Sequence, residues 1–383
     1  MTESNSKSIV SHLHPRPSFD LADHPVPFGK EEVWRFTPMD RMAPLFDADA
    51  EWTEPEITIE GVGGGSWVAT MQPAKPELTC GEMLVPVDRP SAIARARVSK
   101  SYRLYLETPD PDPVVFAIEG TGQSQAVRLS IEIKPGNHGV VVLRHTGDGA
   151  FIGNVEIVVG DGADLTVVSL QEWNDDALHA GFHQAVVGRD AHYRHVAVTF
   201  GGSLVRLQNN VTYDGPGGVA ELYGLHMTDD HQHHEHRLFV DQNEPDTVSR
   251  VDYRGALQGK GARSVWVGDV LIRRQAKRVD SYESNRNLLL TPGCVAESVP
   301  NLEIETGDII GAGHSSATGR FDDAQLFYLQ SRGIEEDAAR RLILQGFFYD
   351  IIRRIGVPDV ESRLRAAVDA ELDAASIHTQ EGN

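Results

Sequence analysis

The chain has 383 residues, 40% hydrophobic and 24% charged, so it can bury a large core in one big domain or in two to three smaller ones. Its 35 basic and 56 acidic residues give a net charge of -21, which argues against a nucleic-acid binder, because such proteins carry a basic patch. The only two cysteines, Cys80 and Cys294, are far apart in sequence and exclude a disulfide framework and a CxxC metal site. They fit a reducing cytosol. No apolar run approaches the roughly 18 residues that a membrane span needs. We therefore expect a cytoplasmic protein.

The N-terminal third predicts mixed structure. Residues 1–20 are polar and offer little to bury, so we expect a mobile tail there. Residues 21–112 read as an α/β region, in which KEEVWRFTPMDRM at 30–42 predicts a short helix or turn with an aromatic anchor. Short strands follow, broken by GVGGG at 61–65. The alternating prolines of PDPDP at 109–113 stop both helix and sheet and predict a domain boundary.

A long β region occupies residues 113–318. Short runs such as DLTVVSLQEW, LVRLQNNVTY and VSRVDYRGAL are separated by Gly, Asn and Asp, as turn chemistry requires. No amphipathic helix interrupts them, which excludes a βαβ sheet. A sandwich, a barrel and a parallel β-helix remain open. Many evenly spaced runs with weak self-similarity favour the β-helix, a solenoid in which each coil buries its face on the next.

The stretch from Pro300 to Ile334 predicts a hinge between the β region and a helical end. Its glycines, Gly311, Gly313 and Gly319, permit backbone conformations closed to other residues, so a tight turn is expected there. His314 lies in that turn, in GAGHSS. A lone histidine in a Gly/Ser turn is more often a hydrogen-bonded structural residue than a ligand.

Three helices are predicted after the hinge, in a C-terminal region covering 319–375, with a mobile tail at 376–383. The first, 322–332, starts at the N-cap Asp322 with Gln325 as in a capping box, and Gly333 is placed to end it. The second, 335–355, carries an apolar stripe formed by Ala339, Leu342, Ile343, Phe347, Ile351 and Ile355. The third, 359–373, carries a stripe formed by Val360, Leu364, Val368 and Leu372.

The richest group of potential metal ligands is the run His231-Gln232-His233-His234-Glu235-His236. On a strand, His234 and His236 share one face, and paired imidazoles with a nearby carboxylate are a plausible zinc or iron site. One alternative is therefore a metal-dependent β-fold enzyme, cupin-like or carbohydrate-active. The other interpretation is that the histidines line a strand or bond to turns. The sequence contains no GxxxxGK[ST], GxSxG or HExxH motif.

Several motifs resemble the SufB/SufD family of iron–sulfur cluster assembly proteins, strongly over residues 200–350 and loosely elsewhere. The most specific are NRNLLL, PNLEIE, GHSSATG and FYLQSRGI. The chain length and KEEVWRFTPMDRM are closer to the SufD branch than to the longer SufB. The resemblance implies a mainly β fold, with a right-handed parallel β-helix core between an N-terminal α/β region and C-terminal helices.

The resemblance also implies partners. Family members pair SufB with SufD through their β-helices, and each binds one copy of the ATPase SufC, which gives a SufB–SufC2–SufD complex. The C-terminal helices would carry the SufC contact, with Phe327, Tyr328, Arg332, Phe347 and Phe348 as candidates. Alone, the chain is a possible homodimer.

The family motif at the hinge has a cysteine where this chain has Ala312, while its histidine matches His314. The resemblance therefore implies a non-enzymatic scaffold subunit that contributes His314 to a transient iron–sulfur cluster, with thiolates from a SufB-like partner. Two cysteines at unrelated positions cannot supply four thiolates, so we expect no cluster on the isolated chain. A flavin is possible in the complex.

Overall fold

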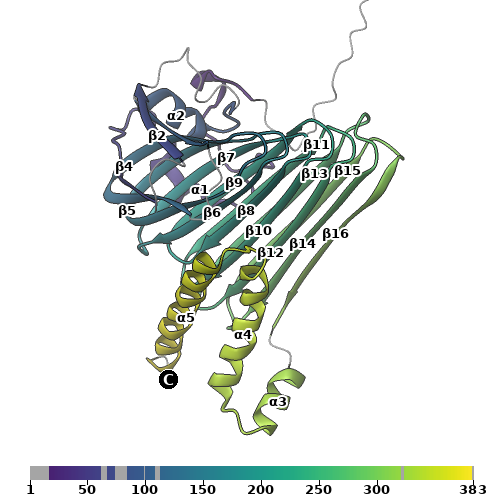
Figure 1. Ribbon diagram of the computed structural model, residues 1–383. Coiled ribbons are helices and arrows are strands. Elements are labelled where there is room, and N and C mark those ends of the chain that lie inside the picture. Colours follow the sequence, from purple (N-terminus) through teal and green to yellow (C-terminus); the bar gives the residue numbers. More distant parts are fainter. Residues whose placement is uncertain are drawn as a thin grey trace, which may run out of the picture.

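Two rows of parallel strands coil around one core (Figure 1). This arrangement is seen in a computed structural model that describes residues 17–61, 67–73, 84–98, 100–107, 113–320 and 323–381. One row, here the even sheet, runs β5-β6-β8-β10-β12-β14-β16, and the other, the odd sheet, runs β5-β7-β9-β11-β13-β15. Successive strands alternate between the rows, so the chain winds as a parallel β-solenoid. The predicted β-helix core is confirmed.

The strands of the solenoid follow one another with short turns. They are β4 (Val114–Ile133), β5 (His138–Val159), β6 (Asp164–Trp173), β7 (Leu178–Gly188), β8 (His192–Thr199), β9 (Leu204–Asp214), β10 (Val219–Thr228), β11 (His233–Gln242), β12 (Val248–Leu257), β13 (Arg263–Ile272), β14 (Val279–Leu289), β15 (Val295–Ile304) and β16 (Ile309–Gly319). Strand β5 serves both rows, because its first half pairs with β6 and its second half with β7.

The interior is built by every second residue of each strand. In β10, for example, Ala220 and Leu222 face the core shared by both rows, whereas Tyr223 and Leu225 face outward. Since the period of a strand is two, the pairing register carries this alternation from coil to coil. Any residue can therefore be assigned to the interior or the exterior from its register partners.

The N-terminal region covers the outer face of the odd sheet. It comprises the helices η1 (Leu21–Asp23), α1 (Met39–Met42), η2 (Ala43–Phe46) and α2 (Arg89–Arg97), and the strands β1 (Glu56–Glu60), β2 (Trp67–Pro73) and β3 (Lys100–Leu106). The predicted aromatic anchor is Trp34, which is buried against Phe46 and lies under the guanidinium of Arg206. The GVGGG run from Val62 on, most of PDPDP and nearly all of the predicted N-terminal tail lie outside the described residues.

The C-terminal helices α3 (Asp323–Ser331), α4 (Glu336–Ile352) and α5 (Pro358–Glu381) follow the solenoid, and α4 and α5 pack on the outer face of the even sheet (Figure 1). Gly333 has a positive φ after α3, as predicted for its end. The predicted cap residue Asp322 lies outside the described part of the chain. Helix α5 continues past residue 373, where the predicted helix ends.

The predicted apolar stripe of the second helix is partly wrong. The residues buried on the sheet are Ala339, Leu344, Phe348, Ile351 and Ile352, while Leu342 is exposed. Helix α4 is apolar on more than one face, so its sequence is compatible with two apolar stripes. Packing on the even sheet buries one of them. The stripe of α5 is confirmed, because Val360, Leu364, Val368 and Leu372 are all buried.

The predicted glycine-rich turn around His314 is also wrong. Residues Ile309–Gly319 form the extended strand β16, and Gly311, Gly313 and Gly319 do not have positive φ. At Gly313 the absence of a side chain leaves room for the neighbouring strand, because a Cβ there would lie 3.1 Å from the ring of Tyr282.

Candidate functional site

The last coil of the solenoid, β15 and β16, carries His314. These two strands end their rows, so in the described part of the chain no further strand pairs with their outer edges. Their side chains are half-buried or exposed, in contrast to the buried strands before them. His314 itself is exposed. The chain therefore presents this imidazole at an open end of its β core.

His314 belongs to the column of inward-facing side chains. Ala312, two residues earlier, packs against the interior core, so the alternation of β16 places His314 on the same side. Its register partner on β14 is Glu283. Neighbouring strands lie about 4.8 Å apart, so Glu283 and His314 are stacked on consecutive coils.

Glu283 is the most unusual group near this end. Its side chain is 1% exposed, and neither carboxylate oxygen has a hydrogen-bond partner among the described residues. Burial raises the pKa of this carboxyl to about 9, and the carboxyl of Asp269 adds to the rise. The resting carboxyl is therefore held neutral in its interior position.

Polar side chains accompany this column toward the open end. Asn287 donates from Nδ2 to Oδ1 of Asn285 at 2.7 Å and to Oγ1 of Thr318 at 3.4 Å. Ser315 donates to Ser284 at 3.3 Å. The last two coils are thus joined by polar contacts as well as by the backbone ladder.

His234 and His236 share the interior face of β11, as predicted for a strand. The Oγ1 of Thr228 lies 3.1 Å from Nδ1 of His234, and the Oγ1 of Thr199 lies 3.1 Å from Nε2 of His236. Burial lowers the pKa of His234 to about 3 and that of His236 to about 4, so both rings are neutral. His231, by contrast, is exposed in the turn before β11 and has a positive φ.

More histidines lie in the interior: His226, just upstream of the run, and four that the sequence analysis did not single out, His145, His179, His183 and His195. The ring of His226 stacks on that of His236 at 5.1 Å, and neither of its nitrogens has a partner among the described residues. His183 and His195 approach within 3.1 Å, and His145 and His179 lie further back in the solenoid. The pairing register could have identified these histidines, because polar residues at matching positions of consecutive coils share the interior. Single histidines scattered along the sequence do not show which positions match.

Neutral imidazoles are competent metal ligands, but their placement also matters. Within the described residues, no group of three or more His, Cys, Asp or Glu side chains is arranged to hold a metal ion. The metal-dependent enzyme built on His231–His236 therefore gains no support from the geometry and stays a prediction. Cys294 is half-buried in a turn, donating from Sγ to the carbonyl of Gly259 at 3.3 Å, and Cys80 lies outside the described residues.

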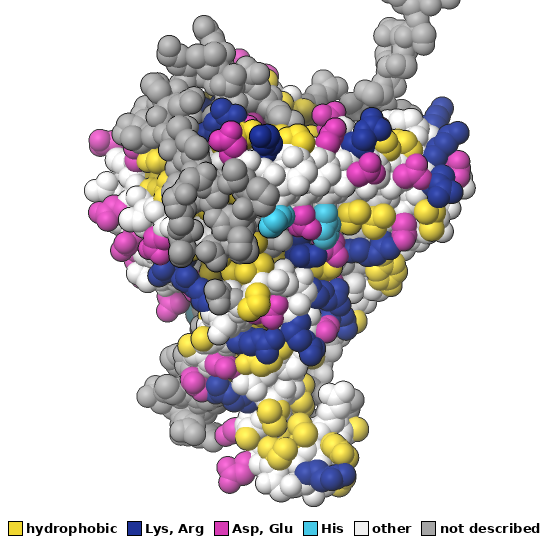
Figure 2. All heavy atoms as spheres, in the orientation of Figure 1, with side chains coloured by type: hydrophobic (Ala, Val, Ile, Leu, Met, Phe, Trp, Pro, Cys, Tyr) yellow, Lys and Arg dark blue, Asp and Glu magenta, His cyan; other side chains and the backbone are white. Residues whose placement is uncertain are grey.

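The second candidate surface lies on α3 and α4. Phe327 and Tyr328 are 72% and 56% exposed, and the guanidinium of Arg332 lies over the Tyr328 ring at 5.1 Å. A groove between the two helices is lined by Ala324, Gln325, Tyr328, Leu329 and Ile343. Figure 2 shows hydrophobic side chains gathered at this lower end of the molecule.

The other two candidates for partner contact lie deeper. Phe347 is half-buried, and its carbonyl accepts a hydrogen bond from Arg254 at 2.8 Å. Phe348 is fully buried between α4 and the even sheet. Phe348 therefore cannot touch a partner in this arrangement, since it is part of the core.

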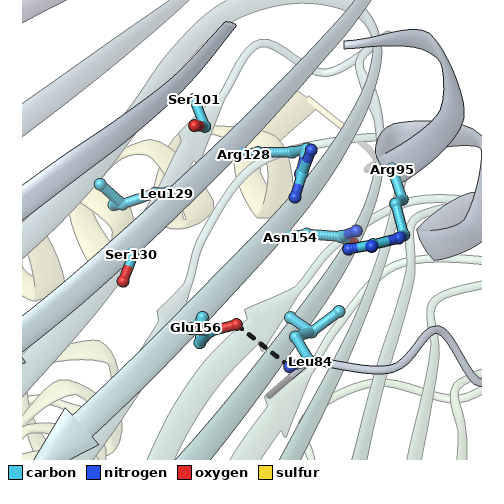
Figure 3. Close-up of a pocket in the computed structure, with 8 residues that line it drawn as sticks. All are labelled: Leu84, Arg95, Ser101, Arg128, Leu129, Ser130, Asn154 and Glu156. Atoms are coloured by element: carbon cyan, nitrogen blue, oxygen red, sulfur yellow. Dashed lines mark hydrogen bonds between the residues drawn. The ribbon is translucent and has the colours of Figure 1, made fainter. Parts of the chain in front are cut away.

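A small cavity beside α2 is far from both surfaces along the chain. It is lined by Leu84, Arg95, Ser101, Arg128, Leu129, Ser130, Asn154 and Glu156 (Figure 3). The backbone N–H of Leu84 donates to the Glu156 carboxylate at 3.1 Å, which ties the N-terminal region to β5. The cavity serves packing in this region and brings in none of the predicted site residues.

The described helices include none that is long and apolar enough to cross a membrane.

The SUF system FeS cluster assembly, SufBD core domain family matches residues 116–347. An iron-sulfur cluster assembly SufBD family protein of Mycobacterium bovis is 47% identical over 366 residues, 93% of this chain and 92% of that protein. A protein of the same description from Mycobacterium leprae is 46% identical over 365 residues, 93% of each chain.

The iron-sulfur cluster assembly protein SufD of Escherichia coli is more distant, at 24% identity over 216 residues, 56% of this chain and 51% of that one. The matched family spans more than half of the chain and includes the open coil and most of α4. From the β-solenoid, the family match and these relatives together, the chain belongs to the SufBD family of iron–sulfur cluster assembly proteins.

Proposed function

We propose that this chain is a scaffold subunit of an iron–sulfur cluster assembly complex and acts in the cytoplasm without catalysing a reaction itself. The observation that carries the proposal is the open last coil. A solenoid exposes an unsatisfied strand edge and a partly apolar interior wherever it is not capped. At this end Val295, Ile304 and Ile310 are exposed, and so is His314.

The partner at this end is a SufB-like paralogue, with a second copy of this chain as the substitute when the paralogue is absent. Pairing there would cover the exposed apolar side chains and satisfy the backbone groups of the free edges. His314 then supplies one ligand for iron or for a forming cluster, which is cargo rather than a resident cofactor. The partner supplies the thiolates, because Ala312 occupies the position of the family's cysteine.

The second partner is a SufC-like ATPase, docked on α3 and the free side of α4. Phe327, Tyr328 and Leu342 are exposed there, and aromatic and Arg side chains are the residue types that dominate binding energy at interfaces. Arg332 lies beside Tyr328 and completes the patch. Phe347 lies at its border. A flavin would belong to the assembled complex rather than to this chain.

Size-exclusion chromatography with light scattering tests the proposal. The purified chain is run alone and then with the SufB-like and SufC-like proteins of the same organism. We expect a defined complex with two copies of the ATPase. Its absence with both partners would refute the scaffold function.

Two variants then separate the two surfaces. Phe327→Ala with Tyr328→Ala should remove ATPase binding and leave the paralogue bound, because these side chains lie outside the core. His314→Ala should leave the complex intact and lower cluster formation. A complex that forms clusters normally with His314→Ala would refute the role of this imidazole.

A further inference from the structure

The coil beneath His314 contains a buried acid that the cluster-assembly role does not use. Glu283 lies on β14, one coil before the open end, and faces the interior. Both of its carboxylate oxygens are without partners among the described residues, although the side chain is 1% exposed. A buried polar group without a hydrogen bond is costly and calls for an explanation such as a bound ion.

The odd sheet leaves room for this carboxyl. Opposite it, β13 has Gly268, and a Cβ at that position would lie 2.3 Å from Oε2 of Glu283 and 2.5 Å from the Trp266 ring. Any side chain other than hydrogen would therefore collide with the carboxyl or the indole. The glycine creates the space in which the carboxyl sits.

Glu283 is the residue that the strand register pairs with the exposed His314. Glu283 and His314 are register partners on the two last strands of the even sheet, about 4.8 Å apart at the backbone. A metal ion that binds there would displace the proton of the neutral Glu283 carboxyl, and carboxylate and imidazole together suit a divalent first-row metal ion. Among the described residues, neither oxygen of Glu283 has a hydrogen-bond partner that would satisfy it instead of a metal ion.

We propose that Glu283 and His314 together form a divalent-metal site at the open end of the solenoid, which receives ferrous iron as cargo. The inference rests on the proposed scaffold function and adds the second ligand from this chain. The remaining positions are taken by water until a partner covers the coil. Two protein ligands make the site weak in the isolated chain, which suits cargo that must be passed on.

The test uses the full chain and Co2+, a spectroscopically visible stand-in for Fe2+. Titration to millimolar concentration is followed by visible absorption and by calorimetry. We expect one weak site, with Glu283→Gln and His314→Ala each weakening Co2+ binding about tenfold or more. The double variant should bind Co2+ at least as weakly as the worse single variant, because it keeps neither of the two protein ligands.

Glu297→Gln is the matched control. Glu297 lies on the neighbouring strand β15, is partly exposed, and pairs with Arg263 at 3.1 Å, so the same substitution removes a carboxyl group outside the site. It should leave the affinity unchanged. Thermal unfolding of each variant checks that the fold is kept.

The outcomes separate the two proposals. Normal Co2+ binding by Glu283→Gln would overturn the shared site while leaving the role of His314 intact. A wild-type chain without a Co2+ site overturns the inference too. Failure of the scaffold function itself would appear separately, as failure to assemble with the partners.

Discussion

The two outer faces of the solenoid are covered in different ways. On the odd sheet the N-terminal region is fastened by buried charges as well as apolar contacts. On the even sheet α4 and α5 are fastened by apolar side chains, including Phe348, Ile351 and Leu364, and by the buried Arg254 of β12, which pairs with Asp350 of α4. Hydrogen-bonded charges require one geometry, whereas apolar contact is less directional. Both covers therefore include directional contacts that fix their place on the sheet, and the exposed side chains of α3 remain for a partner.

The charged fastening centres on Glu235, on the outer face of β11. Its carboxylate accepts from Thr37 at 2.7 Å and from Arg206 at 3.1 Å, and Arg206 also reaches Asp88 at 3.1 Å. Burial alone would raise the pKa of Glu235, yet Arg206 and His233 hold it well below its usual range. The group is thus ionised and paired at neutral pH.

Breaking this network should have the largest effect. Glu235→Ala removes one of the two carboxylates that pair with the buried Arg206, and should lower the free energy of unfolding by about 3–5 kcal/mol. Urea unfolding measures it. Glu303→Ala, at an exposed acid on β15, is the control, with a change within about 0.5 kcal/mol. Equal losses of stability in the two variants would contradict the role of the buried charged network in fastening the N-terminal region.

The apolar cover is tested with a pair of phenylalanines. Phe348→Ala should cost about 3–5 kcal/mol of stability, because it opens a cavity under α4. Phe327→Ala removes the same atoms from an exposed position and should change stability by less than about 0.5 kcal/mol. Thermal and urea unfolding give both values. If Phe327→Ala were as destabilising, α3 would be packed rather than available to a partner.

The interior that both covers enclose is tested at Gly268. Gly268→Ala brings a methyl group against Glu283 and Trp266 and should cost about 1–3 kcal/mol through overpacking. Gly307→Ala meets nothing within 4 Å and is the matched control, neutral or slightly stabilising. Calorimetric unfolding compares the two. A neutral Gly268→Ala would show that the space beside the carboxyl is larger than the geometry indicates.

The smallest effect is expected at the rim of the even sheet. His192 lies 3.1 Å from Asp164 and 2.9 Å from Glu221, and hydrogen bonds to these two carboxylates raise its pKa from 6.5 to about 9. The charged imidazole therefore stabilises the fold fully below pH 6.5, and this contribution is lost as the pH rises through 9. Because Asp164 is half-exposed, the contribution should be on the order of 1 kcal/mol.

The free energy of unfolding, measured from about pH 6 to about pH 10, checks this expectation. His192→Asn should remove that part of the decline with rising pH. An identical pH profile in the variant would assign the decline to other groups.

Some elements of the fold could be predicted from the sequence and others could not. Turn residues at regular spacing identified most strands of the solenoid, and the α5 stripe was found because its apolar residues follow a single helical period. Strand β16 was not found. Its run GAGHSSATG has few β-formers, and extended structure there comes from pairing with β14, a tertiary contact.

The candidate site shows the same division. The sequence by itself identified His314 and the run at His231–His236 as candidate metal ligands. Histidines drew attention because the chain has only two cysteines, the other common ligand of zinc and iron. It gave no reason to connect His314 with Glu283, 31 positions earlier. Only the coil register brings these residues together, because strands pair between coils and not along the chain.

The family resemblance supported the β-helix among the open β architectures and showed that Ala312 stands where the family has a cysteine. The sequence pattern by itself determined the mainly β class and the period of the last helix. These follow from local composition, which short-range physics controls. The tertiary structure decided which stripe of α4 is buried, which residues face the interior, and where the solenoid is left open. Those depend on which surfaces meet, and the chain order does not specify that.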